Sequence, residues 1–350
     1  MNIALVGYFG HDNLGDEAIL QSVLQQLKKY HVPLRIIVFT QTPQETSRRY
    51  KVIAFRRKSW PDLLAGITMT DVVVFAGGSL LQDKTSFKSL LYYLSIIFLA
   101  RIFKKKIILY AQGIEDFRYP LSKWLVKTFL GYTHFISVRD EESYKYLKDV
   151  LKIKKPVHYT VDSALMLCPL QTDNRYLGYI GLNFIDIENF PYKNVSDTLV
   201  KFSREHNKKY VYIPFHEEDL KIAGTLQQLI PSQYFEVLQP QENISMLIGI
   251  MQQLDMVIGT RLHSLILSAA AYTPFMGIHY HDKVESFAKE VKQKYMLFDN
   301  LQNGHFYSNL VDVFSQKESY KNQLKFLVED LKTKSKNNLI NNIIIKYDKT

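Results

Sequence analysis

The sequence predicts an α/β fold with two Rossmann-like domains, each built around a parallel sheet. Short apolar runs alternate with segments of helical periodicity along most of the 350 residues, as expected of parallel strands joined by helices. The runs form two sets, which the segment CPLQTDNR at residues 168–175 separates. Glycines and polar residues follow many of the runs, at the carboxyl ends of strands where open parallel sheets bind their ligands.

In the first set, each predicted strand is a short apolar run, often rich in β-branched or aromatic residues. These runs cover residues 2–7, 34–39, 71–76, 106–111, 134–138 and 157–161. Between the first two runs, the segment from Glu17 to Tyr30 is predicted to be a helix, because its apolar residues fall on one helical face. Those residues are Ile19, Leu20, Val23, Leu24 and Leu27.

The second set of predicted strands covers residues 179–184, 210–215, 234–238, 255–259 and 275–280. Residues 315–331 are predicted to be a helix, and the end of the chain is rich in Asn and Lys. We therefore expect an N-terminal domain at residues 1–170, a C-terminal domain at residues 171–310, and a C-terminal helix with a mobile tail at residues 311–350.

The composition excludes several classes of protein. A hydrophobic fraction of 47% with 13% aromatic residues is typical of a folded chain and not of a disordered one. The single cysteine, Cys168, excludes an internal disulfide framework and a cysteine-rich metal site, and we expect no metal centre. The opening segment MNIALVGYFG lacks the basic start and cleavage site of a signal peptide. We therefore expect a reducing, cytoplasmic location.

The net charge of +10 favours an anionic partner, such as nucleic acid, a membrane surface or a phosphorylated substrate. The basic residues are scattered among acidic ones and form no nucleic-acid-binding signature, so we expect no nucleic acid partner. The apolar segment 90–100 is shorter than the roughly 20 residues of a membrane span. This segment and the lysine-interrupted segment 121–132 fit either helices of the fold or helices that rest on a bilayer, so peripheral membrane contact stays open.

The segment GYFGHDNLGDEAIL at residues 7–20 predicts a glycine-rich turn between a strand and a helix. Its glycines match neither nucleotide-binding fingerprint, and it lacks the Walker lysine. Gly7, Gly10 and Asn13 fit two interpretations. They form either a capped turn whose glycines adopt positive φ, or a loop whose backbone contacts a sugar.

Two further strand ends carry residues that suit anion binding. Gly77, Gly78 and Ser79 follow a predicted buried strand, where successive amides form either an anion nest or a simple tight turn. Arg139 ends another predicted strand. Its guanidinium fits two roles: it binds a carboxylate or phosphate through paired hydrogen bonds, or it pairs with the acidic residues that follow it.

The segment GTRLHSLILS at residues 259–268 joins a predicted strand to a predicted helix. Arg261 and His263 then fall in the first helical turn, where free backbone amides and the positive helix end attract anions. Arginine adds planar donors, and histidine can hold and release a proton near neutral pH. Lys283 supplies a second cation at the end of the next strand–loop unit. On spacing alone, these residues fit either a structural helix start or an active site.

In their order and approximate spacing, four segments resemble the polysaccharide pyruvyl transferase family: GYFGHDNLGDEAIL, AGGSLLQDKTS, SVRDEES and GTRLHSLILSAAAYTPFMGIHYHDKVESF. The resemblance spans most of the chain. It implies a glycosyltransferase-B-like arrangement, with the acceptor side in the N-terminal domain and the donor side in the C-terminal domain. It also implies transfer of pyruvate from phosphoenolpyruvate, a co-substrate, onto two hydroxyls of one sugar, with release of phosphate and no cofactor.

Matched motif by motif, the resemblance assigns Arg139, Arg261 and Lys283 to the carboxylate and phosphate of the donor. It assigns His263 to protonation of the donor's methylene carbon. The glycine-rich loops of the N-terminal domain would then line the acceptor side. No residue identifies the acceptor, which the resemblance implies is a sugar of a cell-surface glycan or exopolysaccharide, or of its lipid-linked precursor.

Two short stretches depart from the family pattern. His11 and Asp12 stand where small or aromatic residues are common, and HYHDK at residues 279–283 replaces an expected Asp-Pro-Lys-like turn.

Two other functions also fit the sequence. One is a nucleotide-sugar-dependent glycosyltransferase of the same two-domain architecture, whose second-domain cations would bind a diphosphate. The other is a non-catalytic protein that binds glycan or lipid at the membrane.

Overall fold

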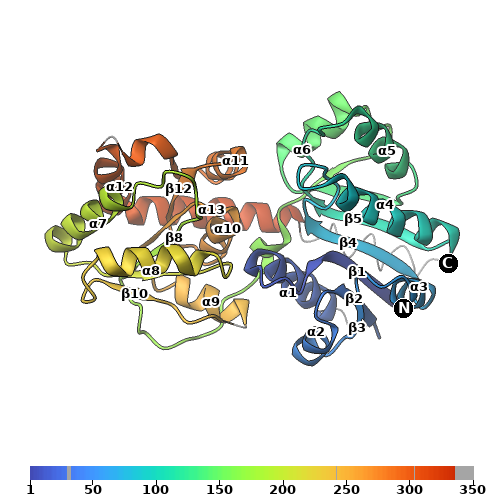
Figure 1. Cartoon of the computed structure of the whole chain (residues 1–350), viewed down its shortest axis with the longest axis horizontal. Coiled ribbons are helices and arrows are strands. Elements are labelled where there is room, and N and C mark those ends of the chain that lie inside the picture. The colour runs from blue at the N-terminus through green and yellow to red at the C-terminus, as the bar shows by residue number, and fades with distance from the viewer. Residues whose placement is uncertain (30–32, 242, 303, 336–350) are drawn as a thin grey trace. The chain divides into compact units, whose positions relative to one another are not determined.

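A computed structural model describes residues 1–29, 33–241, 243–302 and 304–335 of the chain (Figure 1). These residues divide into two compact units. The first unit contains Met1–Ser163 together with the described residues from Leu331 onward, and the second unit contains Ala164–Asp330. Each unit is described by itself.

The observed division of the chain differs from the predicted limits at residues 170 and 310. Leu170 lies in the second unit, where its backbone N–H donates to the Ser245 carbonyl oxygen at 2.8 Å. Leu310 and Val313 are fully buried in the core of the second unit, so the helix that carries them belongs to it. The predicted mobile tail falls on residues 336–350, outside the described residues.

In the first unit, seven parallel strands form a sheet in the order β3-β2-β1-β4-β5-β6-β7. The strand order reverses between β1 and β4, at the topological switch point where such sheets bind ligands. Every strand predicted in this half is confirmed. The six predicted strands are β1 (Asn2–Phe9), β2 (Arg35–Thr40), β4 (Val72–Gly78), β5 (Lys106–Gln112), β6 (Phe135–Val138) and β7 (His158–Tyr159), to which the structure adds β3 (Ile53–Arg56).

Helices pack on both faces of this sheet (Figure 1). The predicted first helix is confirmed as α1 (Leu14–Lys28), which begins earlier than predicted because the Asn13 side chain caps it. The predicted end at Tyr30 lies outside the described residues. The other helices are α2 (Pro43–Tyr50), α3 (Trp60–Thr68), α4 (Phe87–Ile102), α5 (Pro120–Leu130) and α6 (Glu141–Lys145), which a π-helical turn (Tyr146–Val150) extends.

Both faces of the first sheet are apolar, as expected when helices cover a parallel sheet on two sides. Along β1, Ala4 and Val6 contact one cluster of buried side chains, whereas Ile3 and Leu5 contact the other. Burial of each large aliphatic side chain stabilises the fold by about 1.5–3 kcal/mol. The alternation fixes the register of β1 and therefore the position of the glycine-rich loop that follows it.

The second unit contains a six-stranded parallel sheet in the order β10-β9-β8-β11-β12-β13. Its strand order reverses between β8 and β11. The predicted strands are again confirmed. They are β8 (Ile180–Asn183), β9 (Tyr210–Tyr212), β10 (Phe235–Val237), β11 (Met256–Gly259) and β12 (Phe275–His279), to which the structure adds β13 (Lys294–Leu297).

Helices also cover the second sheet (Figure 1). The predicted C-terminal helix at residues 315–331 corresponds to α13, which begins two residues later and is longer. The helices of this half are α7 (Tyr192–His206), α8 (Asp219–Leu229), α9 (Ile244–Met251), α10 (Leu262–Ala270), α11 (Asp282–Glu290), α12 (His305–Ser315) and α13 (Lys317–Ser335).

The apolar segment at residues 90–100 forms most of α4 and is a helix of the core. Leu90, Leu94 and Ile97 are almost completely buried on one side of α4. On its other side, Phe98 is 51% exposed, and Trp124 of the adjacent α5 is 61% exposed. Among the described residues, no helix is both long and apolar enough to span a bilayer.

Candidate active site

The predicted strand-to-helix junction in the second unit places Arg261 and His263 at the start of α10. Arg261 is the extended N-cap residue of this helix, and His263 is its second residue. Gly259 ends β11 at a point where a Cβ atom would overlap the Ser264 hydroxyl, so glycine permits close packing of the helix start on the strand end. The Ser264 hydroxyl donates to the Arg261 carbonyl oxygen at 2.7 Å, which tightens this first turn.

A buried carboxylate holds the Arg261 side chain. Arg261 Nε lies 3.0 and 2.9 Å from the two oxygens of Asp219, and Nη2 donates to Oδ1 at 2.5 Å. Asp219 is completely buried, whereas the Arg261 side chain is 27% exposed. The backbone N–H groups of Phe215 and His216 also donate to Asp219, at 2.9 and 3.2 Å. The guanidinium is therefore fixed in orientation, and Asp219 balances much of its charge.

Asp219 was not among the predicted site residues. It begins α8, after the strand β9, and it lies 42 residues before Arg261 in the sequence. The signal that could have found it is an acidic residue in the first turn of a helix that follows a buried strand. Asn183, at the end of β8, donates its side-chain N–H to Asp219 at 3.4 Å. The ends of β8, β9 and β11 therefore meet at this carboxylate.

His263 lies in the same first turn as Arg261 and is half-buried. Its Nε2 atom is shielded from solvent. The backbone amides of this first turn lack intrahelical partners, as at any helix start, and favour a nearby anion. The position suits a histidine that transfers a proton to an anionic substrate.

Lys283 is the second residue of α11, which follows β12. β11 and β12 are adjacent parallel strands, with Gly259 paired to Gly277, so α10 and α11 begin at the same edge of the sheet. Arg261, His263 and Lys283 therefore come from neighbouring strand–helix junctions of one unit. The atypical HYHDK loop forms an ordered helix start, because His281 Nδ1 accepts from the Lys283 N–H at 3.4 Å.

Arg139, the remaining predicted donor ligand, lies in the first unit directly after β6. It is 7% exposed, and its Nη1 donates to the buried carboxylate of Asp162 at 2.7 Å. Asp140, a partner weighed from the sequence, lies farther away, with its Oδ2 3.5 Å from Arg139 Nε. Burial opposes the charged form, but the charges of Asp162 and Asp140 outweigh it and raise the pKa of Arg139. Arg139, like Arg261, is held by a buried acid that the sequence did not identify.

The second glycine-rich loop lies beside Arg139. Gly77 and Gly78 adopt left-handed φ angles of +75° and +74°. A Cβ atom on Gly113 would lie 2.6 Å from Ser79 Oγ and 3.0 Å from Arg139 Nε. The ends of β4, β5 and β6 therefore bring Ser79 and Arg139 together around a glycine.

The first glycine-rich loop carries local structural roles for each of its predicted residues. Gly10 has a φ of +73°, and its N–H donates to Glu17 Oε1 at 2.9 Å. Asn13 Oδ1 caps α1 by accepting from the Gly15 N–H at 3.0 Å. Gly7 leaves room for the Phe9 ring. These contacts match the capped-turn interpretation, and sugar contact by this loop stays a prediction.

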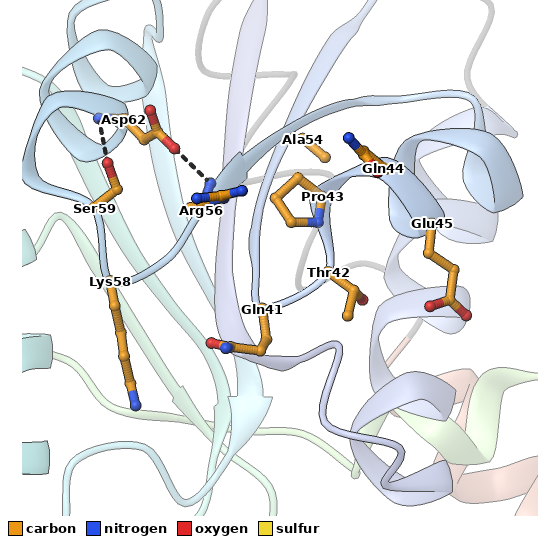
Figure 2. Close-up of a pocket in the computed structure, with 10 residues that line it drawn as sticks. All are labelled: Gln41, Thr42, Pro43, Gln44, Glu45, Ala54, Arg56, Lys58, Ser59 and Asp62. Carbon is orange, nitrogen blue, oxygen red and sulfur yellow. Dashed lines mark hydrogen bonds between the residues drawn. The ribbon is translucent and has the colours of Figure 1, made fainter.

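A pocket of ≈ 830 Å³ lies in the first unit and was not predicted from the sequence. It opens where β2 and β3 end (Figure 2), near the first glycine-rich loop. Asp62 Oδ2 accepts one hydrogen bond from the backbone N–H of Arg56, at 3.0 Å, and shapes one wall. The pocket is lined by Gln41, Thr42, Pro43, Gln44, Glu45, Ala54, Arg56, Lys58, Ser59 and Asp62. Among the described residues, no three His, Cys, Asp or Glu side chains form a group that could hold a metal ion.

UDP-GlcNAc 2-epimerases and a protein solved with UDP and glucose are among the solved structures with similar folds. The UDP-GlcNAc 2-epimerase from Neisseria meningitidis, bound to UDP-GlcNAc, matches with a TM-score of 0.66 at 13% identity, covering 100% of both chains. The UDP-GlcNAc 2-epimerase from Methanocaldococcus jannaschii gives 0.60 at 12% identity, covering 87% of this chain and 91% of that one. Anabaena Alr3699/HepE, in complex with UDP and glucose, gives 0.63 at 10% identity, covering 100% and 99%.

These likenesses confirm the predicted fold class, two Rossmann-like domains of the glycosyltransferase-B-like type. No curated protein matches the chain. A family model described as polysaccharide pyruvyl transferase matches residues 13–282. Because this match spans most of the sequence, the chain belongs to the polysaccharide pyruvyl transferase family.

Proposed function

We propose that the protein transfers pyruvate from phosphoenolpyruvate onto two hydroxyls of one sugar. The acceptor would be a cell-surface glycan or exopolysaccharide, or its lipid-linked precursor. Family membership supports this reaction class. The observation that carries the proposal is the first turn of α10, where a guanidinium fixed by Asp219 lies in the same turn as a half-buried histidine.

The reaction balances without a cofactor. Protonation of the methylene carbon of phosphoenolpyruvate converts it to a methyl group and makes C2 electrophilic. One sugar hydroxyl then attacks C2, the C2–O bond to phosphate breaks, and the second hydroxyl closes a cyclic ketal. The two hydroxyls together lose two protons, which compensate for the proton gained by the methyl group and the one gained by the released phosphate.

In this reaction His263 is the acid that protonates the methylene carbon. A positioned general acid contributes about 10²–10⁴-fold to the rate. Arg261 presents planar donors to the donor's phosphate or carboxylate, and the pair with Asp219 keeps these donors aligned. Lys283 and the amides at the starts of α10 and α11 add positive potential for the same anion. The assignment of Arg139, which Asp162 holds, to the donor stays a prediction.

Incubation of the purified protein with phosphoenolpyruvate and a panel of saccharides tests the proposal. We expect phosphate release that depends on the saccharide and equals the ketal formed. His263→Gln should lower turnover by about 10²–10⁴-fold while the protein stays folded. Near-normal turnover in this variant would exclude His263 as the acid.

A nucleotide-sugar glycosyltransferase is the second candidate, since similar solved structures contain UDP or UDP-sugars. In that case the cations of the second unit would bind a diphosphate. The same saccharide panel, incubated with UDP-sugars in place of phosphoenolpyruvate, separates the two functions. Release of UDP without consumption of phosphoenolpyruvate would support the second candidate.

We also propose that the protein contacts the inner face of a membrane through α4 and α5, which pack against each other. Phe98 and Trp124 are exposed on these helices, next to exposed basic residues such as Arg101 and Lys127. Exposed aromatic side chains interspersed with cations suit an anionic bilayer surface. Sedimentation with anionic vesicles should fall for Phe98→Ser/Trp124→Ser but not for Phe326→Ser, a 76% exposed control in α13. Equal sedimentation of the wild type, the Phe98→Ser/Trp124→Ser variant and the Phe326→Ser control would refute this contact.

A further inference from the structure

Arg57 lies directly after β3 and is buried in the first unit, but no aspartate holds it as Asp162 holds Arg139 and Asp219 holds Arg261. It is 4% exposed. Its Nη2 donates to the Tyr93 hydroxyl at 2.8 Å, and its Nη1 lies 2.7 Å from His11 Nε2. Because guanidinium only donates, His11 must accept here in its neutral form. In the part of the chain that the structure describes, Arg57 forms no ion pair with a carboxylate, and its buried Nε has no hydrogen-bond partner.

Aromatic rings surround this guanidinium. Its central carbon lies 4.9 Å from the ring centroid of Tyr8 and 5.2 Å from that of Tyr92. The His11 ring stacks on Tyr8 with centroids 3.9 Å apart. Burial, reinforced by the positive charges of Arg57 and Lys58, lowers the pKa of His11, which agrees with its role as a neutral acceptor.

This environment stabilises the charge only in part. Cation–π contacts offset only part of the free-energy cost of burying a charge without a countercharge. The contrast within the chain is direct, since Arg139 and Arg261 are each bonded to a buried aspartate. An arginine that is buried without an acid is a position where a bound anion would supply the missing countercharge.

The location of Arg57 also favours a ligand. It follows β3. Tyr8 lies near the end of β1, His11 follows β1, and the contacting residues of α4 lie near them, so the cluster lies at the carboxyl edge of the sheet. The residues on either side of it, Arg56 and Lys58, line the ≈ 830 Å³ pocket (Figure 2). Tyr8 is 43% exposed and His11 is half-buried, so the cluster reaches solvent.

We propose that Arg57, positioned by His11 and Tyr93 and assisted by Lys58, binds a phosphoryl group attached to the saccharide acceptor. The term acceptor rests on the proposed function, whereas phosphoryl binding by this cluster does not. The adjacent pocket, with Gln41, Gln44 and Ser59 among its lining residues, would hold sugar hydroxyls. His11, which departs from the family pattern, would then tune the acceptor preference of this chain.

Calorimetric titration with glucose 1-phosphate, glucuronate and glucose tests this proposal without any turnover. We expect glucose 1-phosphate to bind most tightly, and Arg57→Gln to weaken it by about 10- to 100-fold. Arg118→Gln, which removes an exposed arginine of the same unit, is the matched control and should bind like the wild type. Lys58→Gln changes an exposed residue, so it keeps the fold, and it should weaken binding by about 3- to 10-fold.

Two further arms identify the source of the phosphoryl group and separate the two proposals. A short-chain polyprenyl diphosphate sugar in detergent that binds more tightly than glucose 1-phosphate indicates a lipid-linked acceptor, whereas equal affinity indicates a soluble glycosyl phosphate. Phosphoenolpyruvate affinity should be unchanged in Arg57→Gln, because the proposed donor site uses other residues. Equal affinity of the wild type, Arg57→Gln and Lys58→Gln for glucose 1-phosphate would overturn the proposal, as would equal affinity of the wild type for glucose. Absence of phosphate release from phosphoenolpyruvate would overturn only the proposed function.

Discussion

Asp219→Asn removes the charge that fixes Arg261 while it keeps the shape of the side chain. Asp219 is fully buried and accepts from the guanidinium and from two backbone N–H groups. Removal of one member of a buried pair costs about 3–5 kcal/mol. Because 27% of the Arg261 side chain is exposed, water can solvate the guanidinium partly, and we expect a smaller cost of about 2–3 kcal/mol in the free energy of unfolding. In a unit of this size, that cost lowers the melting temperature by about 5–10 °C.

Thermal unfolding followed by circular dichroism measures this loss, with Glu236→Gln as the control in the same unit. Glu236 also forms an ion pair with an arginine, Arg175, at 2.5 Å, but the side chains are 29% and 62% exposed. An exposed pair contributes about 0–1 kcal/mol, so the control should melt close to the wild type. The KM for phosphoenolpyruvate should also rise in Asp219→Asn, since Arg261 loses its fixed orientation. If Asp219→Asn melts like Glu236→Gln, Asp219 does not hold Arg261 as argued.

Three further outcomes follow from the geometry. Gly10→Ala places a Cβ atom against the Thr40 hydroxyl, on a residue whose φ is +73°. The free energy of unfolding should fall by about 1–3 kcal/mol, and the melting temperature should fall with it. An unchanged melting curve would contradict the assigned turn. Lys283→Met should raise the KM for phosphoenolpyruvate about tenfold, with a smaller change in kcat. Steady-state kinetics in which kcat falls and the KM stays unchanged would exclude donor binding by Lys283. The pKa of His11 is lowered in the folded state, so the unfolded chain binds more protons and stability falls as the pH drops below about 6.5. In His11→Phe, denaturation curves should show a smaller loss of stability over the same pH range. An identical loss in both proteins would show that His11 does not cause it.

The strand pattern could be predicted from the sequence because buried parallel strands are continuous apolar runs. β3 and β13 were not predicted, because neither is a continuous buried apolar run. They are edge strands of four residues each, and most of their side chains are only partly buried. The first-turn position of Arg261 and His263 was predicted from the change of periodicity after β11, and the structure confirms it.

Which acid holds each of the site arginines could not be predicted, because the pairing depends on which strand ends meet in space. Asp219 is 42 residues from Arg261, and Asp162 is 23 residues from Arg139. One of the two roles that the sequence left open for Arg139 was a pair with the acids that follow it. Asp162, which follows the next strand of the sheet, makes a shorter contact than Asp140 does. The cluster around Arg57 was not predicted for the same reason, since its members come from β1, the loop after β1, the loop after β3, and α4.

Transfer of isotopically labelled pyruvate tests the central claim most directly. The protein would be incubated with phosphoenolpyruvate carrying ¹³C at C2 and with saccharide acceptors, and carbon NMR would follow the label. We predict a ketal carbon on the saccharide, phosphate in equal amount, and loss of both signals in His263→Gln. Label that stays in phosphoenolpyruvate while a UDP-sugar donates its sugar to the same acceptor would contradict the account.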